Sequence, residues 1–296
     1  MKVRLRMSKI KIAELFYSIQ GEGRYMGVPS VFLRTFGCNF KCAGFGMPRG
    51  ELSMEASGFA ATHSLITPFQ KYEDLPLVST GCDSYASWMP EFKDLSPMLT
   101  SDAIAERIME IIPHGEWRDE HLVITGGEPL LGWQRAYPDL LDHPKMAGLT
   151  EITFETNGTQ KLTPEFKEYL KQWQMRTWHN GGPVREVTFS VSAKLPASGE
   201  KWGEAILPEI VREYEQVGTA YLKFVVATEQ DIKDAECAVG AFRSAGFHGH
   251  VYLMPVGGVE SVYTLNAKNV ALAAMKRGWR YSDRLQVPLF KNEWGT

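Results

Sequence analysis

Hydrophobic and polar positions alternate, or apolar residues form short continuous runs, in seven segments of the chain, and helical periodicity falls between them. The segment after Ser101 shows this periodicity most clearly, because Ile104, Ile108, Ile111 and Ile112 recur at helical spacing behind a serine suited to an N-cap. We predict strands at 10–19, 30–36, 121–125, 151–156, 184–192, 220–227 and 250–255. Further helices are predicted from the Thr163-Pro164 pair onward and at 206–214, 232–245 and 267–277.

The order of these elements predicts an α/β fold. Strands that alternate with helices form parallel βα units, and parallel folds place their functional residues just after the strand ends. Polar and glycine-rich motifs follow the predicted strands here, among them Gly126-Gly127 and Asn157-Gly158. We therefore expect one domain over residues 1–296, with its site at the carboxyl ends of the strands.

Residues 43–81 interrupt this order. The segment is rich in glycine and proline and shows little periodicity, so we expect a long loop without clear elements. Such loops are either lids and binding loops or tolerated surface insertions, and the sequence favours neither.

Composition narrows the class of protein. Hydrophobic residues make up 44% of the 296 residues, which supports a proper core. The net charge of −3 gives no reason to expect a nucleic-acid or membrane partner. No run of about 18 apolar residues is present, and the basic stretch 1–7 has no apolar segment behind it. We expect a cytoplasmic protein.

Three of the four cysteines, Cys38, Cys42 and Cys82, lie around this loop. Thiolates are soft ligands that select iron–sulfur clusters, zinc or Cu(I). A structural zinc site normally has four protein ligands. Three thiolates without a nearby histidine therefore favour a cluster with one iron open for chemistry. The fourth cysteine, Cys237, lies in a predicted helix, where we interpret it as a buried or half-buried small hydrophobic residue.

The motifs around the cysteines sharpen this interpretation. They are Ser18-Ile19-Gln20-Gly21-Glu22-Gly23, Gly27-Val28-Pro29-Ser30-Val31-Phe32-Leu33-Arg34, Thr125-Gly126-Gly127-Glu128-Pro129 and Glu155-Thr156-Asn157-Gly158-Thr159. Together they resemble the radical S-adenosylmethionine (SAM) enzymes, and most closely the 7-carboxy-7-deazaguanine synthase family, from about Ile12 to Pro255. The resemblance implies a partial (βα)6-type radical SAM barrel.

One departure from the family pattern concerns the third cysteine. Its usual position falls on Phe45, and the expected Cys-Asp-Thr element returns as Cys82-Asp83-Ser84, with Trp88 following as in the family. We interpret residues 43–81 as an insertion in the cluster loop. The alternative is that the site has decayed and Cys82 is incidental.

The resemblance also implies roles for individual residues. Cys38, Cys42 and Cys82 would hold a [4Fe-4S] cluster and Ser84 would bind Mg2+, with no catalytic side chain beyond cluster and cofactor. Substrate contacts would come from Ile19, Gln20, Gly21, Glu22, Arg34 and Thr125. SAM contacts would come from Gly127, Glu128, Glu155, Asn157, Ser192, Ala193 and Lys194. Gln286 and Phe290 lie where the family often has a histidine, and the resemblance assigns them nothing.

The implied activity is that of a carbon–nitrogen lyase in the queuosine precursor pathway. It converts 6-carboxy-5,6,7,8-tetrahydropterin to 7-carboxy-7-deazaguanine with loss of ammonia. The family also implies a flavodoxin or ferredoxin as electron donor, and a homodimer. Two alternatives stay open. One is another radical SAM enzyme, such as an activase acting on a protein glycine, and the other is a non-enzymatic module in which the cysteines hold zinc.

Overall fold

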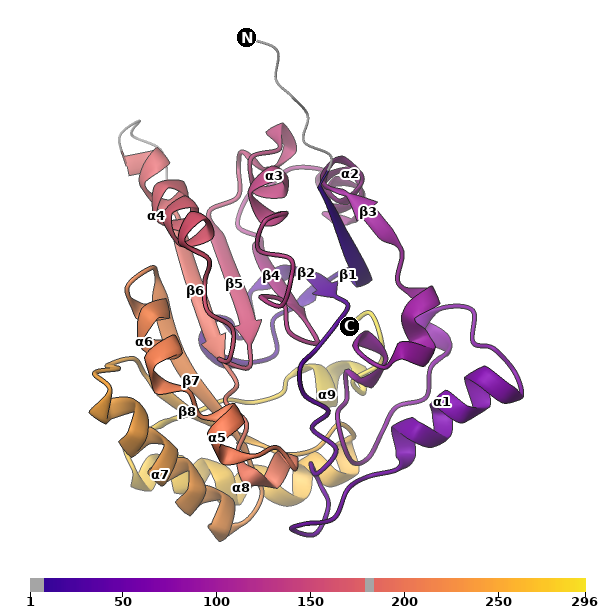
Figure 1. The fold of residues 1–296 in the computed structure, drawn as a ribbon, viewed down its shortest axis with the longest axis vertical. Helices are drawn as coiled ribbons and strands as arrows, with labels where there is room; N and C mark the ends of the chain where they lie inside the picture. Colours follow the sequence, from indigo (N-terminus) through magenta and orange to yellow (C-terminus); the bar gives the residue numbers. More distant parts are fainter. Residues whose placement is uncertain (1–7, 179–183) are drawn as a thin grey trace.

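A single sheet organises the protein in the computed structural model, which describes residues 8–178 and 184–296 (Figure 1). The basic N-terminal stretch 1–7 lies outside the described residues. Within the described ranges nine strands join in the order β3-β1-β2-β4-β5-β6-β7-β8-β9. Their bounds are β1 Lys9–Ile19, β2 Pro29–Thr35, β3 Met98–Thr100, β4 His121–Gly126, β5 Glu151–Thr156, β6 Glu186–Val191, β7 Thr219–Val226, β8 Val251–Pro255 and β9 Arg280–Tyr281.

The sheet is parallel from β2 to β9, and β1 runs antiparallel to both β2 and β3. Six of the parallel strands were expected from the apolar runs. The short strands β3 and β9 were not, because three and two residues carry no periodicity. The predicted α/β fold is confirmed, and the parallel strands deliver their carboxyl ends to one edge, as in a partial barrel.

Helices cover the outer face of the sheet (Figure 1). The apolar stripe of α4 shows why: Phe166, Leu170 and Trp173 are buried in the main core against the sheet. The bounds are α1 Glu55–Leu65, α2 Ser101–Ile111, α3 Tyr137–Leu141, α4 Pro164–Trp178, α5 Trp202–Ala205, α6 Pro208–Glu215, α7 Glu229–Ser244, α8 Glu260–Lys276 and α9 Gln286–Phe290.

Among the helix boundaries that differ from the predictions, those of α2 and α8 have a clear local reason. Thr100, and not Ser101, is the N-cap of α2, because its hydroxyl accepts a hydrogen bond from the Ala103 amide at 3.2 Å. Helix α8 begins at Glu260, well before the predicted start at Ala267. Its first turns are partly exposed and lack an apolar stripe, so periodicity revealed only its second half.

The expectation that residues 43–81 lack a regular element is wrong, since they contain α1. Ala60 is the one buried residue of this helix, which explains why no apolar stripe marked it. The segment packs on a small second core formed with Tyr72, Tyr85 and Phe92, against which Trp294 from the C-terminal segment also packs. Figure 1 shows α1 at the edge of the molecule, away from α4, α6 and α7.

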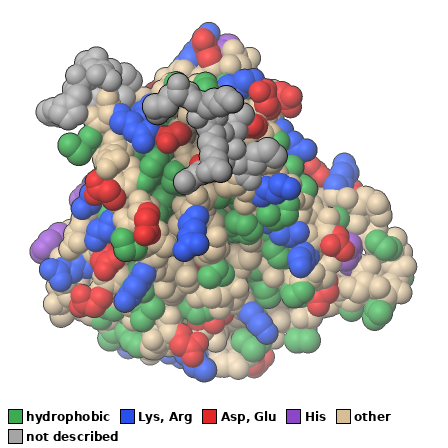
Figure 2. All heavy atoms as spheres, turned by 45° about the horizontal axis from the view of Figure 1, so that its top comes forward, with side chains coloured by type: hydrophobic (Ala, Val, Ile, Leu, Met, Phe, Trp, Pro, Cys, Tyr) green, Lys and Arg blue, Asp and Glu red, His purple; other side chains and the backbone are tan. Residues whose placement is uncertain are grey.

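The surface offers no membrane-crossing element among the described helices, because none is long and apolar enough. On the face shown in Figure 2, basic and acidic side chains are interspersed. This face therefore presents no large field of one sign.

His121, at the start of β4, is fully buried and packs at a tilt against the Tyr25 ring, with ring centroids 4.3 Å apart. Neither ring nitrogen has a hydrogen-bond partner among the described residues. Burial, with a smaller effect from Arg24, lowers the pKa of His121 to about 3. The imidazole is therefore neutral in the folded protein.

We predict that this histidine makes stability fall in mild acid. Below pH about 6.5, His121 becomes protonated in the unfolded chain. In the folded chain it stays neutral until the pH falls to about 3. The free energy of unfolding should drop by up to about 1.4 kcal/mol per pH unit on this account. Denaturant unfolding at stepped pH measures it, and His121→Phe should remove that part of the slope.

The matched control is the same substitution at His114, which is exposed and keeps its contact with water in both states. His114→Phe should retain the parent slope. Equal slopes for the parent and His121→Phe would contradict the prediction.

Candidate active site

A cavity of about 240 Å³ opens at the carboxyl ends of the parallel strands, a space suited to a small molecule more than to a single ion. Most of the residues that the family motifs nominate line it together, although they are spread from Ile19 to Lys194 along the chain. They are Ile19, Gln20, Gly21, Glu22, Arg34, Cys38, Cys42, Cys82, Ser84, Thr125, Gly127, Glu155, Asn157, Ser192 and Lys194.

Glu128 and Ala193 do not line this cavity. Glu128 is fully buried behind the wall, where its carboxylate accepts hydrogen bonds from the Asn157 amide at 2.7 Å and the Thr156 hydroxyl at 2.8 Å. Burial raises the pKa of Glu128 to about 7, and the hydrogen bonds from backbone amides oppose that rise. In this structure the carboxylate positions the loop after β5 and does not face a ligand.

The cysteines meet at one end of the cavity. Cys42 is buried with Phe40 and Ala205, and Cys38, Cys82 and Phe45 pack against this group. All three thiols are free. Burial raises the pKa of Cys38 to about 12 and that of Cys82 to about 11, and it raises the pKa of Cys42 as well. The thiols are therefore protonated until a metal displaces their protons.

The backbone of the cysteine loop is held by neighbouring loops. Cys42 has a positive φ of 51°, a conformation that costs a non-glycine residue of order 1–3 kcal/mol. The Glu200 carboxylate accepts hydrogen bonds from the amides of Lys41 at 2.8 Å and Cys42 at 2.7 Å, which stabilises this conformation. At Gly127 an added Cβ would collide with the Gly37 carbonyl and the Cys38 side chain, so only glycine allows this close approach.

The arrangement of the thiols suits a cluster better than a single ion. Among the described residues no three His, Cys, Asp or Glu side chains converge as the ligands of one metal ion. Ligands of one ion must meet at a point, whereas thiolates on a four-iron cluster bind separate irons. The donor set, three buried or partly buried thiols in one side-chain cluster, fits three corners of such a cluster.

Arg34 and Ser84, two further predicted site residues, are joined by a hydrogen bond. Arg34 donates from Nε to the buried Glu14 carboxylate at 2.7 Å, and from Nη1 to the Ser84 hydroxyl at 2.9 Å. The Ser84 hydroxyl lies 3.4 Å from the Asp83 carboxylate. Arginine, serine hydroxyl and carboxylate therefore share one wall of the cavity.

A second part of the wall is built around Glu155 on β5. Its carboxylate accepts hydrogen bonds from Gln20 Nε2 at 3.2 Å and from the Thr125 hydroxyl at 3.0 Å. Asn157 reaches the cysteine loop, donating from Nδ2 to the Asn39 side chain at 2.9 Å. Residues nominated separately for substrate and for SAM thus form one hydrogen-bonded wall.

Comparisons with known proteins identify relatives of the whole chain. Proteins named 7-carboxy-7-deazaguanine synthase match nearly the whole chain: from Halobacterium salinarum at 29% identity, covering 96% of this chain and 91% of the relative, and from Rhodopirellula baltica at 27%, covering 98% and 90%. The chain is a relative of the 7-carboxy-7-deazaguanine synthases. The family resemblance drawn from the motifs is confirmed.

Among solved structures, the crystal structure of QueE from Escherichia coli has a TM-score of 0.51 at 20% identity and covers 94% of both chains. This likeness confirms the fold. No protein-family model matches the chain.

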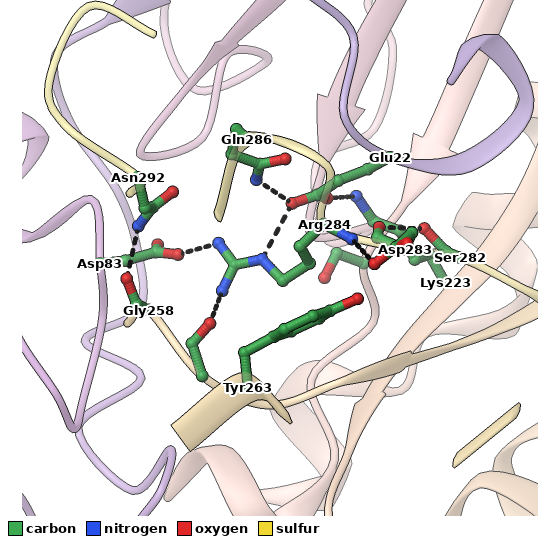
Figure 3. Close-up of polar contacts among 12 residues, drawn as sticks. Glu22, Asp83, Lys223, Gly258, Tyr263, Ser282, Asp283, Arg284, Gln286 and Asn292 are labelled. Carbon is green, nitrogen blue, oxygen red and sulfur yellow. Dashed lines mark hydrogen bonds and ion pairs between the residues drawn. The ribbon is translucent and has the colours of Figure 1, made fainter. Parts of the chain in front are cut away.

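The site also contains a buried charge network that the sequence motifs did not reveal (Figure 3). Arg284 follows β9, and its guanidinium donates to Glu22 at 3.2 Å, to Asp83 at 2.5 Å and to the Gly257 carbonyl. Lys223 on β7 also pairs with Glu22, and Gln286 donates to it at 2.9 Å. Although burial disfavours its charge, Lys223 and Arg284 lower the pKa of Glu22 to about 2.

Only part of this network could be recognised in the sequence. Lys223 is a lysine inside the apolar run of β7, which could have marked it as a pocket residue. The same holds for Glu14, the partner of Arg34, which is a carboxylate inside the apolar run of β1. Arg284 and Gln286 stand in a short polar segment with no such contrast. Their role depends on where the chain returns after β9.

Cys237 is exposed on α7 and does not line the cavity. The interpretation of this residue as a buried or half-buried hydrophobic side chain is wrong. Its distance in sequence from any glycine-rich loop agrees with a position outside the cysteine group.

We predict that Arg284→Met destabilises the protein strongly. The substitution leaves the buried carboxylates of Glu22 and Asp83 short of their shared cation, which typically costs about 3–5 kcal/mol. Arg118 pairs with Glu116 on the exposed surface, so Arg118→Met should cost only about 0–1 kcal/mol. Denaturant unfolding at pH 7 measures both.

The two costs should also differ in acid. The low pKa of Glu22 gives stability that is present above pH about 4.5 and is lost as the pH falls toward about 2. The gap between the parent and Arg284→Met should therefore narrow over this range. A gap that is small at pH 7, or constant with pH, would contradict the network's role.

Proposed function

We propose that this protein is a radical SAM enzyme that converts 6-carboxy-5,6,7,8-tetrahydropterin to 7-carboxy-7-deazaguanine with loss of ammonia. The observation that carries the proposal is the convergence of three thiols and the side chains of four motifs on one small-molecule cavity. Relatives named for this activity match the chain over nearly its whole length.

Cys38, Cys42 and Cys82 would hold the [4Fe-4S] cluster. When bound, the cluster supplies the electron that cleaves SAM to a 5′-deoxyadenosyl radical, which takes hydrogen from the substrate. A zinc module is less well supported, because structural zinc takes four ligands that converge on one ion and the described residues offer no such group. Lys194, whose positive charge reaches all three thiols, favours their thiolate form.

SAM would lie between the cluster and the wall built by Glu155 and Asn157. The Gly127 backbone, which approaches Cys38 closely, gives the cofactor's polar end access to the main chain. Beside this wall, Lys194 Nζ donates to the Ser192 hydroxyl at 2.9 Å, and the Ser192 amide donates to the Thr156 carbonyl at 2.8 Å. Glu128 and Ala193, which do not line the cavity, would support the loops that bind SAM.

The substrate would bind where Ile19, Gln20, Gly21 and Glu22 meet Arg34 and Thr125. Arg34 offers a planar guanidinium to the substrate carboxylate. Gln20 and Glu22 offer amide and carboxylate groups to the N–H groups of a pterin ring. The cavity is lined from many parts of the chain, which suits a small molecule better than a protein glycine, so an activase is the weaker alternative.

Mg2+ would bind at Ser84. Magnesium takes oxygen ligands and keeps several waters, and the Ser84 hydroxyl lies beside the Asp83 carboxylate. Arg34 now donates to this hydroxyl. When a substrate carboxylate takes the guanidinium, the hydroxyl is released for the metal.

Residues 43–81 would be an insertion in the cluster loop of a single domain, 1–296. Leu77, Val78, Ser79 and Gly81, at its end, line the cavity, so the segment forms part of the wall and is more than a surface loop. The remaining parts of the proposal follow the family: a flavodoxin or ferredoxin as reductant, a homodimer and a cytoplasmic location.

We predict that the reconstituted protein, given reductant, SAM and Mg2+, forms 7-carboxy-7-deazaguanine from the tetrahydropterin. Cys82→Ala should lose the cluster and all SAM cleavage, because two thiolates retain a cluster poorly. Cys237→Ala is the matched control and should keep both, since Cys237 is exposed on α7. Iron content, the visible spectrum and chromatography of products measure these outcomes.

Three results would separate the alternatives. SAM cleavage without the ring-contracted product rejects the substrate while sparing the radical SAM chemistry. A colourless protein that takes up zinc in place of iron favours the zinc module. Loss of the cluster in Cys237→Ala, with retention in Cys82→Ala, would mean that the Cys82-Asp83-Ser84 match is accidental.

We also predict that Ser84→Ala reduces the response of turnover to Mg2+ while the cluster stays intact. Ser84→Thr keeps the hydroxyl and is the control that should retain the response. Steady-state rates across a magnesium titration measure the effect. An Mg2+ response in Ser84→Ala equal to that of the parent would remove Ser84 from the metal site.

A further inference from the structure

Trp88 is joined to the third cysteine, Cys82, by a short stretch of backbone. Two consecutive tight turns connect them, because the Tyr85 amide donates to the Cys82 carbonyl and the Trp88 amide donates to the Tyr85 carbonyl, each at 3.2 Å. Residues 85–87 form a 3₁₀ turn, in which side chains three positions apart eclipse one another. Cys82 and Trp88 stand at the two ends of these turns, and both line the cavity.

The segment is fixed from several directions. The Gly37 amide, next to Cys38, donates to the Ser87 carbonyl at 2.8 Å. Tyr85 is fully buried, and its hydroxyl donates to the Pro76 carbonyl at 2.8 Å. Trp88 consequently keeps its place relative to both Cys38 and Cys82.

The indole nitrogen of Trp88 lacks an acceptor. Trp88 lines the cavity together with Cys82, and its Nε1 is buried without a partner at hydrogen-bonding geometry among the described residues. An indole N–H can only donate, so leaving it buried and unpaired is unfavourable. Trp294, in the same aromatic core, instead donates from Nε1 to the Leu75 carbonyl at 3.1 Å.

The Cys82 sulfur is the acceptor at hand. The Trp88 side chain lies within reach of a side-chain hydrogen bond to Cys82, and both residues line the same cavity. A neutral thiol accepts only weakly, whereas a thiolate bound to iron is a better acceptor.

We infer that the indole N–H of Trp88 donates a hydrogen bond to the Cys82 sulfur of the bound cluster and raises the reduction potential of that cluster. Hydrogen bonds to cluster sulfurs stabilise the added negative charge of the reduced state. Trp88 is in this role a positioning residue, because it acts through Cys82. The inference rests on the proposed function, since it requires the cluster.

The direct test uses the whole parent protein, grown with tryptophan isotope-labelled at the indole nitrogen and loaded with its cluster. Pulsed EPR of the reduced protein should show a magnetic coupling between the cluster and the labelled nitrogen. Trp88→Phe should lose this coupling, and Trp294→Phe should keep it. A loaded parent without any such coupling overturns the inference.

The consequence for potential is tested by redox titration followed by EPR. Trp88→Phe should shift the midpoint potential to a more negative value, while Trp294→Phe, the same chemical change in the same aromatic core, should match the parent. Equal potentials in all three proteins overturn the inference. If Trp88→Phe does not load a cluster, the labelled parent alone decides the question.

The result is separable from the proposed function. A parent that takes up no iron overturns the proposed function and this inference with it. If the parent holds its cluster and cleaves SAM but shows no coupling between the cluster and the labelled nitrogens, this inference alone is overturned.

Discussion

Buried ion pairs between the two ends of an open sheet turn that sheet into a pocket. Glu22 follows β1 and Arg284 follows β9, and they meet with Lys223 from β7 and Asp83 from the end of the cysteine loop. Backbone contacts add to this closure, because the Leu285 amide donates to the Gly21 carbonyl at 3.0 Å. Buried charges of this kind contribute little net stability, but removing one partner is costly, so they specify a single arrangement.

Two sets of contacts position the cysteines: the ion pairs that close the sheet, and the hydrogen bonds that the cysteine loop makes itself. Asp83 is held by Arg284, which places its neighbours Cys82 and Ser84 on the cavity wall. Glu200 holds Cys42 through two backbone amides. A long segment between Cys42 and Cys82 is thermodynamically tolerable, because each doubling of loop length costs only about 0.6 kcal/mol. The structure fixes both ends of this segment: Glu200 holds the end at Cys42, and Arg284 holds the end at Asp83.

The sequence could predict whatever depends on local pattern. The apolar runs of β4 and β5 located two central strands, and the glycines and polar residues after them marked the carboxyl edge where the cavity lies. Local pattern could not show that Glu128 turns away from the cavity, because its direction depends on amides from the loop after β5. Nor could it reveal α1, which is mostly exposed, or Arg284, whose two carboxylate partners lie about 200 residues or more earlier in the chain.

The central claim is that three thiolates hold a cluster with one iron open to SAM. Its most direct test is the EPR spectrum of the reduced, reconstituted protein recorded with and without SAM. An open iron gains new ligands when SAM binds, so the account predicts a clear change in the spectrum. A spectrum that SAM leaves unaltered, or a protein that retains zinc and no iron, would contradict it.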